Sequence, residues 1–204
     1  MKRGIFITFE GGEGSGKSTQ IGFVASYFRR KGRKILLVRE PGSTLIGERI
    51  RKILLDPKNG AMSVKTELFL YLAARAQLVD QVILPALKKG TVVISDRYED
   101  STIVYQGYAG GLPLNQLKQI VKAARGEVMP QLTFLLDVDV RKGLKRSGRR
   151  DRVEKKSLNF HERIRQGFLT LSKQNPKRFA VISSEISKQE VQKKIKANLD
   201  HVFS

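Results

Sequence analysis

The sequence of 204 residues contains no cysteine, which excludes a disulfide framework and a zinc–thiolate site. Its two histidines, His161 and His201, do not form a cluster with metal-ligand spacing. No stretch approaches the roughly 20 apolar residues that a membrane-spanning helix needs. The apolar run 5–9 is too short for the core of a secretory signal and ends at Glu10. We therefore expect a soluble, cytoplasmic protein with no membrane partner.

Acidic residues are scarce: the sequence has 19 Asp and Glu against 39 Lys and Arg, which gives a net charge of +20. Such a field attracts nucleotides, nucleic acids and acidic membranes. Most of this charge fits solvated helix faces, as at Lys193, Lys194 and Lys196. The sequence does not identify a purpose for the excess charge.

Short apolar runs alternate with longer helical patterns, and no repeat or long linker interrupts them. The runs are continuous rather than alternating, as in strands that are buried on both faces. They predict strands at 5–9, 35–38, 92–95, 132–137 and 179–182. The helical patterns predict helices at 17–30, 45–54, 64–89, 114–124, 141–146, 157–173 and 188–203. This alternation indicates an α/β fold in which helices flank a five-stranded parallel sheet, formed by one domain over residues 1–204.

A glycine-rich loop follows the first predicted strand and precedes the first predicted helix. It fits the P-loop pattern G-x-x-x-x-G-K-[ST], in which glycines let backbone N–H groups surround phosphate oxygens. Lys17 can neutralise the β- and γ-phosphates, and the Ser18 hydroxyl can coordinate Mg²⁺. The predicted ATP-binding residues are Gly11, Gly12, Glu13, Gly14, Ser15, Gly16, Lys17, Ser18 and Thr19.

Two further strands end in arginines. The third strand is followed by Asp96 and Arg97, and the second by Arg39. Asp96 is suited to hold Mg²⁺ or its waters, and the two arginines can grip a second phosphate in paired hydrogen bonds. A local salt bridge in a turn would equally explain the pair at 96–97. The N-K-x-D and D-x-x-G motifs of a guanine-specific GTPase are missing.

The ordered set of motifs closely resembles bacterial thymidylate kinase over essentially the whole chain. The motifs are Glu13 in the P-loop, Arg39-Glu40-Pro41-Gly42, Ala73-Ala74-Arg75, Asp96-Arg97-Tyr98, Ser101-Thr102-x-x-Tyr105-Gln106-Gly107 and Asp151-Arg152-x-Glu154. The resemblance implies a nucleoside monophosphate kinase-like P-loop fold, ATP and dTMP as ligands, Mg²⁺ as cofactor and a homodimer.

The resemblance also implies a thymidine site. It gives Tyr71 the role of stacking on thymine and Arg75 that of donating a hydrogen bond to a base carbonyl. Thr102 would bond the pyrimidine edge and Tyr105 would crowd the sugar. Glu13 would lie near the 3′-hydroxyl and the metal. The remaining predicted pocket residues of the helix after strand three are Ser101 and Gln106. Ser101 could also cap the start of that helix, and both roles can hold at once.

Residues 141–156 form a strongly basic segment that resembles the lid of the lid-arginine type of this family. Gly14 occupies the P-loop position where other members have an arginine. The candidates for the arginine that contacts the transferring phosphate are Arg149, Arg150 and Arg152, and the sequence leaves the choice among them open. A solvated basic loop or a nucleic-acid contact would also explain the charge.

The predicted reaction is transfer of a phosphoryl group from ATP to dTMP. Lys17, Arg97, Glu13 and a lid arginine would be its catalytic residues, which align the reactants and neutralise charge. One alternative is a kinase of the same fold for another deoxynucleoside monophosphate. The other is a basic nucleic-acid-binding ATPase, which the lack of an aromatic-and-basic RNA platform disfavours.

Overall fold

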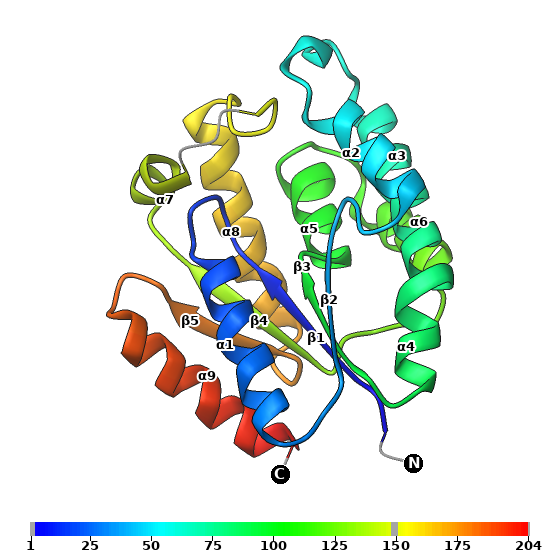
Figure 1. The fold of residues 1–204 in the computed structure, drawn as a ribbon. Coiled ribbons are helices and arrows are strands. Elements are labelled where there is room, and N and C mark those ends of the chain that lie inside the picture. Colours follow the sequence, from blue (N-terminus) through cyan, green and yellow to red (C-terminus); the bar gives the residue numbers. More distant parts are fainter. Residues whose placement is uncertain (1–2, 148–150, 204) are drawn as a thin grey trace.

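The computed structural model describes residues 3–147 and 151–203. Within these ranges the chain forms a sheet of five parallel strands with helices on both faces (Figure 1). In order across the sheet, the strands are β2 (Ile35–Arg39), β3 (Val92–Asp96), β1 (Ile5–Glu10), β4 (Leu132–Asp137) and β5 (Phe179–Ser183). The predicted sheet is confirmed, and each strand begins at its predicted residue.

Strand β1 lies at the centre of the sheet, where Ile7 is beside Ile94 of β3 and Leu132 of β4. All six residues of β1 are buried, which explains the continuous apolar pattern of its sequence. Because the strands are parallel, their carboxyl ends meet at one edge of the sheet. In folds of this kind, ligands bind beyond that edge.

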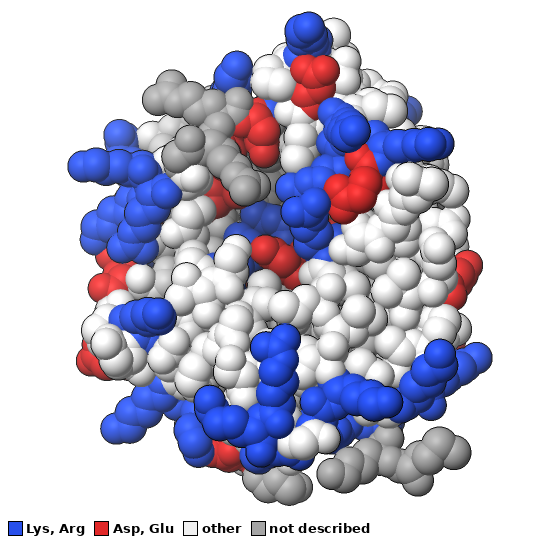
Figure 2. All heavy atoms as spheres, viewed as in Figure 1, with Lys and Arg blue, Asp and Glu red and all other residues white. Residues whose placement is uncertain are grey.

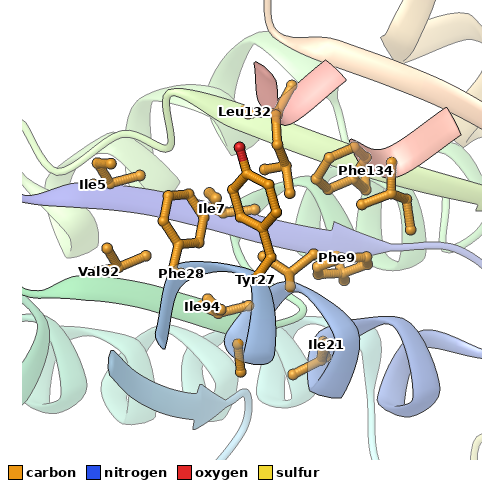
Figure 3. Packing of buried hydrophobic residues seen from close by; sticks show 14 of the residues in the cluster. Ile5, Ile7, Phe9, Ile21, Tyr27, Phe28, Val92, Ile94, Leu132 and Phe134 are labelled. Atoms are coloured by element: carbon orange, nitrogen blue, oxygen red, sulfur yellow. The ribbon is translucent and has the colours of Figure 1, made fainter. Parts of the chain in front are cut away.

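One face of the sheet packs against α1 (Lys17–Arg30) and α9 (Lys188–Phe203). Figure 3 shows Tyr27 and Phe28 of α1 among the side chains of β1, β3 and β4, including Ile7, Ile94 and Phe134. These apolar side chains leave water on folding, which is the main favourable contribution to the stability of such a layer. The packing fixes α1 directly behind the loop that joins it to β1.

The opposite face is covered by α8 (Leu158–Gln174) and by a long helix that begins with α3 (Val64–Leu78). Phe6 and Val93 point to this face and pack with Leu78 and Ile83. Along β1, Phe6 therefore faces one layer and its neighbours Ile5 and Ile7 face the other. The alternation binds both helical layers to the same strand.

The single helix predicted over 64–89 is interrupted by one wider turn. Residues Val79–Ile83 form a π-helical segment, after which α4 (Leu84–Lys88) continues. Pro85, the second residue after this turn, has no N–H to donate to the helix, so the hydrogen-bond pattern changes just before it. The helix α3 is thereby held with one face toward the edge of the sheet where the site lies.

This long helix, Val64–Lys88, is also apolar enough by length and composition to cross a membrane, with a mean hydropathy of 1.2. In the structure Leu68, Leu72 and Leu78 are buried in the interior, and the charged Arg75 between them is buried in an ion pair. These contacts identify it as a core helix of a globular chain.

The remaining helices connect the layers around the carboxyl edge of the sheet. They are α2 (Leu45–Leu55), α5 (Glu99–Thr102) with the π-helical segment Ile103–Tyr108, α6 (Leu114–Arg125) and α7 (Val140–Ser147). Helices α2 and α7 lie on opposite sides of that edge (Figure 1). The space between them contains the cavity described next.

Candidate active site

A cavity of about 550 Å³ lies beyond the carboxyl ends of β1, β2 and β3. Figure 2 shows basic side chains gathered around the hollow on this face. The predicted site residues that line it are Glu13, Gly14, Ser15, Gly16, Lys17, Ser18, Thr19, Arg39, Tyr71, Arg75, Asp96, Arg97, Ser101, Thr102, Tyr105 and Gln106. Segments from four separate parts of the chain thus meet in one cavity of the size typical of ligand sites.

The loop between β1 and α1 has the backbone that its glycines predict. Gly11, Gly14 and Gly16 have φ angles of 137°, 64° and 89°, values that favour residues without a Cβ. A Cβ on Gly11 would lie 2.4 Å from the carbonyl oxygen of Leu136, so the loop also passes too close to β4 for a side chain. Gly11 and Gly12 line a smaller cavity behind the loop.

Lys17 is the first residue of α1 and curls back over the loop. Its Nζ donates to the carbonyl oxygens of Gly11 (3.3 Å) and Gly12 (3.1 Å) and to the Ser15 hydroxyl (3.4 Å). Burial lowers the pKa of Lys17, and the nearby Arg97 lowers it further. An incoming anion at this place would relieve the repulsion between these two cations.

Glu13 forms the link between the loop and the rest of the cavity. Its carboxylate accepts hydrogen bonds from Arg97 Nη2 (2.7 Å) and the Tyr105 hydroxyl (2.9 Å). Burial by itself would raise the pKa of Glu13, but Arg97 and Lys17 outweigh that effect and lower the pKa to about 2. Glu13 therefore keeps its negative charge among cations at neutral pH.

Arg97 is held in a fixed position by three groups. Besides Glu13, its guanidinium donates to the Gly11 carbonyl oxygen (3.0 Å) and to the Ser101 hydroxyl (3.2 Å). Its backbone φ of 69° is in the left-handed region, which is uncommon for a residue with a side chain. Such backbone strain is found at sites whose geometry the surrounding structure enforces. It directs Arg97 from the end of β3 toward the loop.

Ser101 does not cap the next helix, which is the alternative role that its sequence position allows. Helix α5 begins at Glu99 without a side-chain cap, and the Ser101 hydroxyl instead donates to Glu10 at 2.6 Å. Burial, together with the nearby Asp100, raises the pKa of Glu10 to about 8. A carboxyl group buried in the protein needs hydrogen-bond donors, and the Ser101 hydroxyl supplies one.

Arg75 lies in the middle of α3 and is 1% exposed. It forms a buried ion pair with Glu40 (2.5 Å), and its Nη2 also donates to the Thr102 hydroxyl (2.9 Å). Burial opposes the positive charge, but Glu40 outweighs it, so the pKa of Arg75 is raised. The remaining nitrogen, Nη1, is buried without a hydrogen-bond partner among the described residues. A buried donor of this kind is suited to a ligand acceptor.

Two further arginines line the cavity beside Arg75 and Arg97. Arg39, at the end of β2, donates to Glu48 (3.1 Å) and is largely exposed. Arg51 of α2 was not predicted, and its Nη1 donates to the Pro41 carbonyl oxygen at 2.9 Å. No motif marks Arg51, because its position depends on how α2 packs across the cavity.

The basic segment contributes to the cavity through residues on both sides of the undescribed positions 148–150. Arg146, Ser147, Asp151, Val153 and Glu154 line it. The predicted Arg149 and Arg150 lie outside the described residues. Sequence reasoning did not single out Arg146, although it lies one helical turn after Gly143, where α7 contacts the P-loop.

Arg152 does not line the cavity, contrary to its expected place over the phosphates. It is 6% exposed and forms an ion pair with the buried Glu67 (2.5 Å). A carboxylate buried within the protein requires a close partner of opposite charge, which explains this inward position. Glu67, which was also not predicted, accepts a second hydrogen bond from Gln106 Nε2 (2.6 Å).

Oxygen ligands for a divalent cation are present at the predicted positions. The Ser18 hydroxyl and the Asp96 carboxylate both line the cavity, next to the loop. Within residues 3–147 and 151–203, no group of three His, Cys, Asp or Glu side chains could enclose a metal ion. This set fits Mg²⁺, which takes one or two protein oxygens and completes its shell with phosphates and water.

Comparisons with known proteins agree with this geometry. Residues 9–195 match the family described as Thymidylate kinase. A thymidylate kinase of Geobacter sulfurreducens is 49% identical over 188 residues, which cover 88% of both chains. One from Desulfovibrio desulfuricans is 45% identical and covers 92% of this chain and 91% of its own. The crystal structure of thymidylate kinase from Ehrlichia chaffeensis superposes with a TM-score of 0.81 at 33% identity, covering 97% of this chain and 99% of that one.

The contact between the loop and α7 generates a first prediction. A Cβ on Gly143 would lie 2.4 Å from the backbone oxygen of Glu13, so one of the two segments must move. We expect Gly143→Ala to weaken the binding of a non-hydrolysable ATP analogue by about tenfold, as overpacking of a fixed contact costs about 1–3 kcal/mol. Calorimetric titration measures the affinity. Gly22→Ala, whose Cβ meets nothing within 4 Å, is the control and should bind normally.

The charge on Glu13 generates a second prediction. The pKa of Glu13 is about 2 in the folded protein, against an ordinary value of 4.5. The charged carboxylate therefore stabilises the fold fully at pH values above 4.5, and this stabilisation is lost as the pH falls toward the pKa of about 2. Wild-type protein should therefore lose more unfolding free energy than Glu13→Gln between about pH 5 and about pH 3. Denaturant unfolding at several pH values measures this. If the unfolding free energies of both proteins depend on pH in the same way, the charge on Glu13 contributes nothing to stability.

Proposed function

This chain belongs to the thymidylate kinase family, and from that membership we propose how its cavity divides between a donor and an acceptor nucleotide. Its reaction is the phosphorylation of dTMP by ATP, which yields dTDP and ADP. The proposal rests on one observation: the phosphate-binding loop and the arginines of two neighbouring strand ends line the same cavity. The chain would do this work as one domain, with residues 141–156 as its lid.

The donor end is assigned to the loop residues 11–19. Their N–H groups and the start of α1 would surround the phosphates of ATP, and Lys17 would neutralise the β- and γ-phosphates. Ser18 and Asp96 would hold Mg²⁺, which when bound supplies positive charge to the phosphate oxygens. Arg146 is the described arginine best situated to contact the transferring group from α7, with Arg149 and Arg150 as the other candidates.

The acceptor end is assigned to the arginines and the side chains of α3 and α5. Arg39, Arg51 and Arg97 would bind the phosphate of dTMP, for which the planar guanidinium is well suited. The Tyr71 ring would stack on thymine, and the unpartnered Arg75 Nη1 would donate to a base carbonyl. Tyr105 would crowd the sugar. Its ring is supported from behind by Phe160 and Phe168, and its hydroxyl is held by Glu13.

Transfer needs no acid–base triad, because an oxygen of the acceptor phosphate is already a nucleophile. It forms a bond to the γ-phosphorus as the bond from that phosphorus to the bridging oxygen of ADP breaks. Lys17, Arg97 and an arginine of the lid would stabilise the charge on the transferring group. Closure of the lid would exclude water and so prevent the hydrolysis of ATP. The site of action would be the cytoplasm.

A homodimer is proposed from the exposed apolar side chains on one side of the molecule. Leu45, Ile46 and Ile53 of α2, Phe69 of α3 and Ile120 of α6 are exposed, and these helices lie together on the side away from β5 (Figure 1). Large exposed apolar groups that gather in this way are typical of protein interfaces.

The substrate assignment is tested with a panel of monophosphates. Purified protein with ATP and Mg²⁺ should phosphorylate dTMP in preference to dCMP and dGMP, measured by ADP release. Arg97→Ala should lower kcat/KM for dTMP by about 100-fold while changing the affinity for an ATP analogue much less. A preference for dGMP would contradict the substrate. Stimulation of ATP hydrolysis by RNA or DNA, and none by dTMP, would favour a nucleic-acid-dependent ATPase instead.

The dimer is tested by placing a charge on the exposed ring of Phe69, which is 59% accessible in one chain. Phe69→Glu should convert a dimer into a monomer in sedimentation experiments, since burying an unpaired carboxylate in an interface is costly. Val181→Glu, on the exposed part of β5, is the control and should remain dimeric. A wild-type monomer at every accessible concentration would contradict the proposal.

A further inference from the structure

The buried carboxylate of Glu67 connects the end of the basic segment with the base-binding part of the cavity. Glu67 is 3% exposed, in the first turn of α3. One of its oxygens accepts from Gln106 Nε2 (2.6 Å), and the other accepts from Arg152 Nη2 (2.5 Å). Lys156 is a further cation beside it, with Nζ at 3.7 Å. Glu67 itself does not line the cavity, whereas Gln106 does.

This contact fixes which way the Gln106 amide points. A carboxylate in an ion pair has only acceptors, so the branch of the amide that faces Glu67 must be the NH₂ group. The carbonyl oxygen is the other branch and is the one available to the cavity. Gln106 is 1% exposed, so little water competes for its amide and the contact with Glu67 decides the orientation. The site therefore presents an acceptor at Gln106.

A donor is presented close by. Arg75 Nη1 has no partner among the described residues, and Nη2 of the same guanidinium is bonded to Thr102. Thr102 and Gln106 are four residues apart on neighbouring helical turns, α5 and the π-helical segment that follows. The cavity that Arg75, Thr102 and Gln106 line thus offers both a donor and an acceptor to a ligand.

This pair matches only some pyrimidines. Thymine has a carbonyl acceptor at C4 beside an N3–H donor, whereas cytosine has an amino donor at C4 beside an N3 acceptor. An Arg75 donor facing the C4 substituent and a Gln106 carbonyl acceptor facing N3 complement thymine at both positions. The same two groups meet a donor with a donor and an acceptor with an acceptor in cytosine. With the amide reversed, the Gln106 NH₂ group would face N3 and favour cytosine at that atom.

We propose that Glu67 is a positioning residue that sets base selectivity by orienting the Gln106 amide. The inference rests on the proposed function, in which this wall faces the base. Arg152 pairs with the second carboxylate oxygen of Glu67 and is itself anchored to α2. Its Nε donates to the Leu54 carbonyl oxygen (2.7 Å), and its backbone N–H donates to the Leu55 carbonyl oxygen (3.2 Å). Glu67 never touches the substrate and acts only through Gln106.

The test is Glu67→Gln, which replaces an obligatory acceptor with an amide that can both donate and accept. The Gln106 amide can then take either orientation. The ratio of kcat/KM for dTMP to that for dCMP should fall by about tenfold or more, mainly through a higher KM for dTMP. The affinity for an ATP analogue should not change. Glu127→Gln removes the same charge from an exposed loop residue and should keep the wild-type ratio.

A double mutant separates this role from a merely structural one. In a Gln106→Leu background there is no amide to orient, so adding Glu67→Gln should leave the ratio unchanged. Two results would overturn the inference. In one, Glu67→Gln lowers the dTMP-to-dCMP ratio equally with and without Gln106. In the other, Glu67→Gln loses thermal stability but keeps the wild-type ratio. If Glu67→Gln does not fold, a crystal structure of the wild-type protein with dTMP decides: the Gln106 carbonyl should lie about 3 Å from N3, and any other group facing N3 would refute the assignment.

Failure of this inference is distinct from failure of the proposed function. If wild-type protein does not phosphorylate dTMP, the function itself is wrong. If wild-type protein prefers dTMP and Glu67→Gln keeps the same dTMP-to-dCMP ratio, the function stands and Glu67 has no part in selectivity.

Discussion

The cavity depends on pairing buried or partly buried glutamates with arginines. Glu13 is paired with Arg97, Glu40 with Arg75 and Glu67 with Arg152, each at 2.5–2.7 Å. Each pair joins segments far apart in the chain, and an unpaired charge at any of these places would be severely destabilising. The pairs therefore fix the loop after β1 against the end of β3, and α3 against both the end of β2 and Arg152, before any ligand binds. Preorganised charge of this kind is what phosphoryl transfer requires from a protein.

The same pairs divide the arginines into two kinds. Arg75 and Arg152 are almost fully neutralised within the protein and orient other groups, whereas Arg39 and Arg146 are exposed at the rim of the cavity. Only a small part of the net charge of +20 is therefore concentrated where nucleotide phosphates would bind. Basic side chains at the opposite end of the molecule (Figure 2) remain a solvated surface.

Much of the fold was predictable from local pattern. Each strand reads as a short continuous apolar run; every residue of the central strand β1 is buried, whereas the edge strands β2 and β5 are partly exposed. The glycines of the loop after β1 adopt the positive φ angles that their positions imply. The break in the helix at Val79–Ile83 and the role of Ser101 were not predictable, because they depend on Pro85 within a packed layer and on the buried Glu10. Glu67 left a weak signal, as a charged residue on the same helix face as Tyr71 and Arg75.

The sequence by itself determined the order of strands and helices along the chain, the phosphate-binding loop and the kind of residue at each strand end. These follow from periodicity and from spacing between near neighbours. The tertiary structure alone decided which arginine lines the cavity and which turns inward to a glutamate, as the unpredicted Arg51 and the inward position of Arg152 demonstrate. The physical reason is that the direction of a long charged side chain depends on its nearest opposite charge, and that charge comes from a segment distant in sequence.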